Sequence, residues 1–209
     1  MTQRTPSSVT TLILELCADI NPHARPRFVR VKPEPDSLPQ NCFWNVRQKT
    51  ERQGGRIQFG WAIWDSSFPY IEAEHHAVYA PPNNGTWLDL TPDPDGPRWK
   101  RLFLADDAAI YHFDKRNRGL ANIRKTLVDD PLLDELFRLA DEHTAFTNAI
   151  IPNVGEIKTL TPTEAEYDRR NKQRRMAIQW QLAMKYTPRQ ALCFCSSGRK
   201  FKSCHGKAA

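Results

Sequence analysis

Apolar residues recur at helical spacing in two segments near the start of this 209-residue chain. The first follows Ser8, which can cap a helix, and stops at Ile20 before an Asn-Pro pair. The second begins at Cys42 and ends at the Gly-Gly pair after Gln53, and glycine is the usual residue at a helix stop. The pattern therefore predicts two short helices in this region.

Two longer helices are expected toward the C-terminus. Asp130 precedes a proline and an apolar stripe, so it is placed to cap a helix. Thr161, a proline and Glu164 form the pattern of a capping box, after which helical spacing continues to about Tyr186. One apolar stripe of this last helix is expected to face the core or an interface, and it consists of Met176, Trp180 and Met184.

Alternating segments lie between these helices. Residues 56–64, 71–79 and 87–90 alternate as strands do, and residues 101–104 add a possible fourth strand. Five prolines between residues 21 and 41 predict a linker without regular structure. The expected fold class is therefore α+β, with a small antiparallel sheet of three to four strands packed on the helix that begins at Cys42, followed by helices.

The positive charge is concentrated at the C-terminus. The net charge is +6, but residues 169–209 hold eleven Lys or Arg and no Asp or Glu, which leaves −5 for residues 1–168. Such a segment favours an acidic partner, either RNA or an acidic protein surface. No apolar run approaches the roughly 18 residues of a membrane span, so we expect a cytoplasmic protein without a membrane segment.

Three of the five cysteines lie within the last seventeen residues, in the pattern C-x-C-x8-C-H. Zinc prefers four tetrahedral nitrogen or sulfur ligands, and a closed set of four indicates a structural metal. So short a segment buries little surface, so metal binding would have to supply its folding energy. Free thiols on a frayed tail are the alternative. The predicted zinc ligands are Cys193, Cys195, Cys204 and His205.

The stretch CFCSSGRKFKSCHG closely resembles the SEC-C motif, the zinc-binding tail of the bacterial preprotein translocase ATPase SecA. Leu192 stands where the motif usually has proline, and Ser196 where it usually has glycine; neither is a ligand. The resemblance implies a protein partner such as a ribosome or a chaperone. The neighbouring Arg and Lys residues suit an acidic surface on that partner.

A second set of residues suggests chemistry in the first half of the chain. Cys42 opens a predicted helix, where free N–H groups favour a thiolate, and His76 and Asp89 lie on consecutive predicted strands. If Ala80 pairs with Gly85, His76 lies directly opposite Asp89. A thiolate, an imidazole and a carboxylate are the groups that thiol catalysis at an acyl carbon requires.

The alternative is that these residues are structural: a small buried thiol, an ordinary strand histidine and a carboxylate near a turn. Alternation places His75 on the opposite face from His76. Glu72 and Glu74 share one strand face and are expected to lie in solvent.

The order Cys, His, Asp over residues 38–105 resembles the core of transglutaminase-like and, more loosely, papain-like thiol enzymes. The resemblance implies that Cys42 is the nucleophile, His76 the base and Asp89 the orienting group. The expected parts of the chain are an N-terminal helix and Pro-rich linker (1–37), this α+β core (38–105), a helical segment (106–190) and the C-terminal zinc-binding motif (191–207).

Three functions are compatible with these features. The first is a cysteine-dependent peptidase, deamidase or acyltransferase acting on proteins or peptides. The second is a non-enzymatic adaptor whose zinc-dependent tail binds a ribosome, a chaperone or another acidic partner. The third is RNA binding through the basic C-terminal region, although few aromatic residues lie among its charges.

Overall fold

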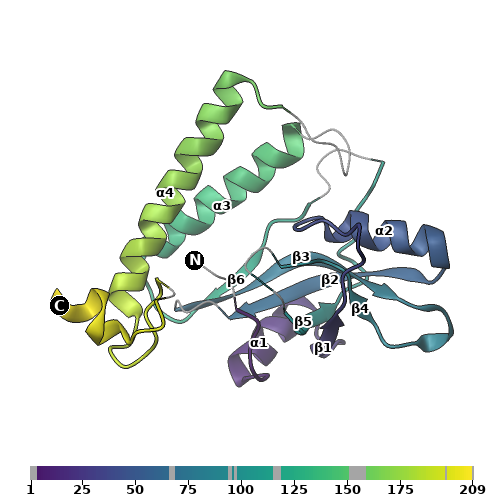
Figure 1. The fold of residues 1–209 in the computed structure, drawn as a ribbon, viewed down its shortest axis with the longest axis horizontal. Helices are drawn as coiled ribbons and strands as arrows, with labels where there is room; N and C mark the ends of the chain where they lie inside the picture. The colour runs from purple at the N-terminus through teal and green to yellow at the C-terminus, as the bar shows by residue number, and fades with distance from the viewer. Residues whose placement is uncertain are drawn as a thin grey trace.

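The structure is a computed structural model that describes residues 4–65, 69–93, 96, 98–114, 119–150, 159–195 and 197–208. Strands form a closed barrel, and helices lie around it (Figure 1). The strands are β1 (Arg27–Val31), β2 (Arg56–Asp65), β3 (Tyr70–Ala80), β4 (Leu88–Asp89), β5 (Lys100–Ala105) and β6 (Ile123–Thr126). The α-helices are α1 (Thr11–Ile20), α2 (Cys42–Gln53), α3 (Pro131–Ile150) and α4 (Pro162–Tyr186), and the 3-10 helices are η1 (Pro82–Asn84), η2 (Phe201–Ser203) and η3 (His205–Ala208).

Five strands close on themselves. The order is β2-β5-β1-β4-β3, and β3 returns to pair with β2 along its whole length. The β1–β4 pair is parallel and the other pairs are antiparallel, so the barrel is mixed. The sixth strand, β6, extends the sheet from β3. The expected small antiparallel sheet of three to four strands packed on a helix is therefore wrong.

The strand β1, which completes the barrel, was not predicted because it lies in a proline-rich segment. β1 occupies five residues without proline in the segment expected to be an irregular linker, and it joins β5 to β4. Only Val29 and Val31 of this strand are buried. Because the strand is short and its alternation is flanked by turn-forming residues, its sequence resembles that of an extended loop.

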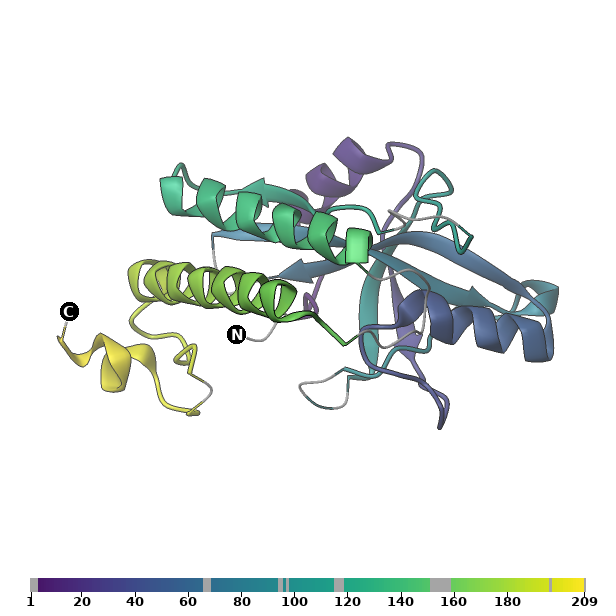
Figure 2. The ribbon, with the colours of Figure 1, turned by 90° about the horizontal axis from the view of Figure 1, so that it is seen from above.

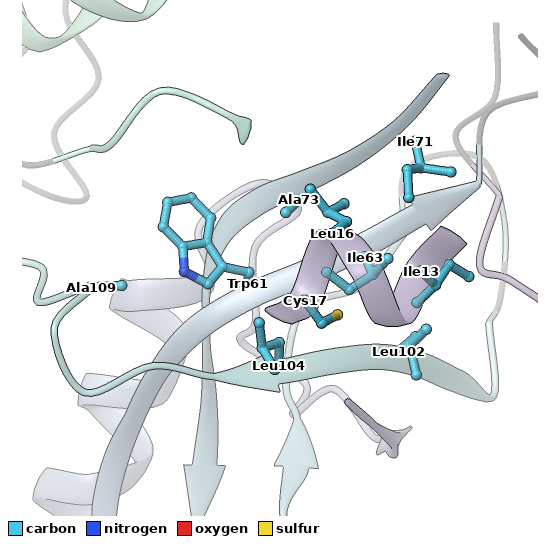
Figure 3. Packing of buried hydrophobic residues seen from close by; sticks show 10 residues of the cluster. All are labelled: Ile13, Leu16, Cys17, Trp61, Ile63, Ile71, Ala73, Leu102, Leu104 and Ala109. Carbon is cyan, nitrogen blue, oxygen red and sulfur yellow. The ribbon is translucent and has the colours of Figure 1, made fainter. Parts of the chain in front are cut away.

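Helices α1 and α2 cover the outside of the barrel. The apolar side of α1 packs on β2 and β5, with Ile13, Leu16 and Cys17 facing the strands (Figure 3). Thr10, and not Ser8, caps this helix. Val46 of α2 packs against a second cluster that includes residues of β3. These contacts fix the start of α2 beside the end of the barrel.

The inside of the barrel holds a mixed set of side chains. Val29 of β1, Val78 of β3 and Phe103 of β5 form one cluster, although β3 pairs with neither of the other two strands. Contact between them must therefore cross the ring. The residues of β3 that alternate with this inward position, such as Ala77 and Tyr79, face the helices.

Helices α3 and α4 form an antiparallel pair beside the barrel (Figure 2). The predicted capping box of Thr161 and Glu164 is confirmed, as is the cap at Asp130. The predicted stripe on α4 does not lie in the core, because Met176 and Trp180 are 59% and 47% exposed. The buried side chains of α4 are instead Asn171, Ile178, Leu182 and Ala183. In the described part of the chain, no helix has the length and apolar character needed to cross a membrane.

Substitution of Gly60 tests the close approach of β2 and β5 in the barrel. A Cβ at this position would overlap the carbonyl oxygen of Leu104 on β5. We expect Gly60→Ala to lower the free energy of unfolding by about 3 kcal/mol, because the β2–β5 pair would have to separate. Gly54→Ala is the control: it has open space and a φ of 69°, so it should cost only about 1 kcal/mol. Urea unfolding would measure both, and equal losses would contradict this account.

Candidate active site and candidate metal site

Cys42 is the first residue of α2 and is 7% exposed. The preceding Asn41 forms no side-chain hydrogen bond with the first turn, and Gln40 has a φ of 60°. The N–H groups of the first turn therefore lack the usual side-chain cap, and they favour negative charge close to Cys42.

The structure brings His76 and Asp89 into contact. The Nε2 atom of His76 lies 3.2 Å from Oδ2 of Asp89, without the alignment of a hydrogen bond. The predicted register is wrong, because Tyr79 pairs with Leu88 and so Asp89 stands opposite Val78. His76 and Asp89 are instead diagonal neighbours on one face, a separation that a histidine side chain can span.

Asp89 is fully buried and is held by two further groups. Arg101 of β5 donates from Nε to Oδ2, and the backbone N–H of Thr91 donates to Oδ1 over 2.8 Å. Because β4 and β5 are not neighbours in the barrel, the bond between Asp89 and Arg101 crosses its interior. Arg101 was not among the residues predicted from the sequence. It lies two residues before Phe103, an inward residue of the same strand, and this spacing is the signal that could have placed it inside the barrel.

The pKa values of both partners are shifted. Burial lowers the pKa of His76, but the charges of Cys42 and Asp89 outweigh it and raise that pKa to about 10. Burial raises the pKa of Asp89, but His76, Arg101 and the Thr91 N–H outweigh it and hold the pKa well below its usual range. At neutral pH, His76 is therefore an imidazolium beside a carboxylate.

Cys42 and His76 share a cavity of about 100 Å³ at the end of the barrel. Asp89 lies behind it and is inaccessible to solvent. The lining residues are Gln40, Cys42, Trp64, Glu74, His76, Thr91, Pro92, Asp93, Arg98 and Arg101. The cavity thus joins a thiol, an imidazole and a backing carboxylate from three elements, an arrangement capable of nucleophilic attack on a small carbonyl group.

The other titratable residues of β3 agree only in part with the predictions made from the sequence. His75 does face away from His76, and its Nε2 lies 2.8 Å from the Ala109 carbonyl oxygen. Burial lowers the pKa of His75, so it is a neutral packing residue. The two glutamates were expected in solvent, which is wrong: Glu72 is buried against Arg124 at 2.8 Å, and Glu74 lines the cavity.

The four predicted metal ligands also come together. The ligand atoms of Cys193, Cys195, Cys204 and His205 all lie within 4.8 Å of one another. Cys193 Sγ is 3.2 Å from His205 Nδ1, and the sulfur atoms of Cys195 and Cys204 are 3.6 Å apart. Hydrogen bonds from Ser197, and from the neighbouring thiols, lower the pKa of Cys195 to about 6. This cluster can hold one metal ion with nitrogen and sulfur ligands.

The tail is built around this cluster and packs on α4. The N–H of Cys193 donates to the Arg199 carbonyl over 2.8 Å, across a turn in which Gly198 has a φ of 72°. The Trp180 ring of α4 contacts the His205 ring edge-on, with centroids 4.9 Å apart. Trp180, expected to face the core or an interface, therefore contacts the tail near the C-terminal end of α4, where the tail lies in Figure 1.

Asp89→Asn tests the buried pair. The variant leaves the cations of Arg101 and His76 without their carboxylate, so we expect a loss of about 3 kcal/mol at pH 6. Because the pKa of Asp89 is lowered in the folded state, its contribution is complete above about pH 4 and is lost as the pH falls further. The difference between variant and wild type in urea unfolding should therefore shrink from pH 6 to pH 3. Asp36→Asn removes an exposed ion pair and should change little at either pH.

The comparisons with known proteins concern the tail. The model of the SEC-C motif matches residues 191–207, so the predicted resemblance there is confirmed. No curated protein and no solved structure matches the chain. The match covers the cluster of three cysteines and one histidine, and it leaves the barrel without an assigned family.

Proposed function

We propose that this protein is a thiol-dependent hydrolase or acyltransferase that acts on protein or peptide substrates, with Cys42 as its nucleophile. The observation that carries the proposal is that Cys42 and His76 line one cavity while Asp89 contacts His76 from behind it. Buried ion pairs are costly unless every charge is compensated. A histidine held charged beside a thiol at an accessible cavity is a feature that catalysis would use.

The chemistry follows from the geometry. The thiolate of Cys42 attacks an acyl carbon, and His76 gives its proton to the leaving group as the carbon–sulfur bond replaces the original bond. Asp89 lies at Nε2, so Nδ1 is the ring nitrogen left to serve Cys42. Asp89 fixes the ring and stabilises its charge, and it does not need to accept the proton.

The negative oxygen of the tetrahedral intermediate needs donors. The backbone N–H of Cys42, at the start of α2, can donate to this oxygen. Gln40 lines the same cavity and is a second candidate donor. Donors aimed at developing charge contribute strongly in a site that excludes water. Water or an amine would then release the acyl group from Cys42.

Alkylation tests the nucleophile. In zinc-loaded protein we expect iodoacetamide to modify Cys42 at pH 7, and His76→Ala to slow this reaction by about tenfold or more because the imidazolium no longer stabilises the thiolate. Peptide mapping by mass spectrometry measures the rate at Cys42 against pH. Cys17 is the internal control, since burial raises its pKa to about 11 and it should stay unmodified. An alkylation rate that does not depend on His76 would overturn the proposal.

A second function is favoured by the tail. We propose that Cys193, Cys195, Cys204 and His205 bind structural zinc, and that the folded tail docks the protein on an acidic partner such as a chaperone or a ribosomal protein. The match to the SEC-C motif supports this role. Four cations of the tail are exposed and available to such a surface: Arg199, Lys200, Lys202 and Lys207.

Removal of zinc tests whether the tail needs a bound metal in order to dock. We expect one zinc ion per chain, lost in Cys204→Ser but kept in Ser203→Ala, which changes the adjacent exposed side chain. Co-sedimentation with ribosomes should fall with Cys204→Ser and after chelation. If both variants sediment equally, the tail does not dock through its metal-bound form. Binding that is destroyed by ribonuclease, and that declines steeply with salt, would instead favour RNA as the partner.

A further inference from the structure

Glu74 is a charged side chain of the cavity that the proposed reaction leaves unused. It lies on β3 two residues before His76, on the same face of the strand. Its Oε2 atom accepts a hydrogen bond of 2.6 Å from the Trp64 indole. Within the ranges that the structure describes, Oε1 accepts no hydrogen bond and Glu74 forms no ion pair.

The arginines of the cavity are committed to other carboxylates. Arg101 is bonded to Asp89, and Arg98 is bonded to Asp93. Both guanidinium groups also lie over the Trp64 ring, at 4.7 and 5.2 Å from its centroid. Both arginines are engaged in these pairs, and neither forms an ion pair with Glu74 in the part of the chain that the structure describes.

His76, on the same face of β3, is engaged with Asp89. Glu74 is therefore the carboxylate of the cavity that has no ion-pair partner among the described residues. A carboxylate in such a place prefers either a proton or a cation.

A second polar atom in the cavity wall also lacks a partner. The Oγ1 atom of Thr91 is buried, in a residue only 5% exposed, and has no hydrogen-bond partner. Thr91 lines the same cavity as Glu74. A buried hydroxyl without a partner costs free energy unless a ligand or water satisfies it. At about 100 Å³, the cavity has room for a group the size of about three water molecules.

We propose that Glu74 and Thr91 form a subsite for a primary ammonium group of a substrate, beside the Cys42 thiol. The carboxylate supplies the counter-charge and the hydroxyl supplies a further acceptor for the N–H groups. A carboxylate ligand would add a second negative charge. The role of the subsite in catalysis rests on the proposed function of Cys42, but the binding of the ammonium group does not.

The protonation of Glu74 agrees with this assignment. Burial raises the pKa of Glu74, which makes its protonated form easier to reach while no cation is bound. An ammonium ion would replace that proton. Binding should therefore strengthen as the pH rises through the titration of Glu74.

Direct binding tests the subsite without any reaction. Calorimetric titration of the full-length, zinc-loaded protein with methylammonium should give saturable binding to the wild type and to Cys42→Ala. Glu74→Gln keeps an oxygen that can accept from Trp64, and it should bind at least tenfold more weakly. Glu72→Gln, which changes a glutamate paired with Arg124 on the same strand, is the matched control and should bind like wild type.

Two comparison compounds, tested against the wild type, keep the experiment decisive if Glu74→Gln fails to fold. Methanol is of similar size but neutral, and tetramethylammonium is charged but has no N–H group; neither should compete with methylammonium. Absence of saturable methylammonium binding, unchanged affinity in Glu74→Gln, or equal binding of tetramethylammonium would each overturn the subsite. Retained binding in Cys42→Ala separates this result from the fate of the nucleophile, which the alkylation of Cys42 decides.

The ammonium group has two possible sources, which kinetics distinguishes. If it is the amino group of the acyl donor, glycine p-nitrophenyl ester should acylate Cys42 faster than its N-acetyl form. If it belongs to an acyl acceptor, methylamine should speed release of the acyl group from Cys42. Either acceleration should be lost in Glu74→Gln and kept in Glu72→Gln. If Glu74→Gln keeps the acceleration that is found, the subsite plays no part in the reaction.

Discussion

The ion pair between Asp89 and Arg101 is the interaction on which the barrel and its cavity both depend. It joins β4 to β5 across the interior, and β4 has only two residues in regular pairing. Few backbone bonds hold Asp89, so its side-chain partners fix its position. That position in turn sets where His76 lies, because the imidazole is the third group at the carboxylate. The same contact therefore stabilises the closure of the barrel and orients the cavity.

A charged interior of this kind is a poor choice for stability alone. Apolar side chains of similar volume often stabilise a core as well as a buried ion pair does or better, whereas removal of one partner is severe. Asp89, Arg101 and His76 occupy the space beside Phe103, where an apolar cluster already begins. Folding alone gives no reason to keep three charges there. A cavity that needs a fixed imidazolium gives one, and this supports chemistry at Cys42 over a purely structural role.

The sequence predicted correctly those features that depend on interactions between residues close together in the chain. The capping box at Thr161 and the ligand set at the C-terminus are each encoded within a few residues, and both were foreseen. The closure of the barrel depends on β1, whose partners lie far away in the sequence, and the prolines around it obscured the strand. Glu74 shows the same limit: alternation placed it on the face of His76, but only the closed ring makes that face an interior.

The tail packs at the end of α4, and α2 lies on the other side of the barrel from it in both views (Figures 1 and 2). A metal held by Cys193 and His205 would not be part of the cavity that Cys42 lines, because the cluster and the cavity share no residue. Its effect would reach the barrel only through packing: His205 contacts Trp180, and α4 packs with Tyr70 at the start of β3. Because such contacts between packed elements transmit position more than charge, a metal in the tail would affect the barrel through the placement of α4 and not through its own charge.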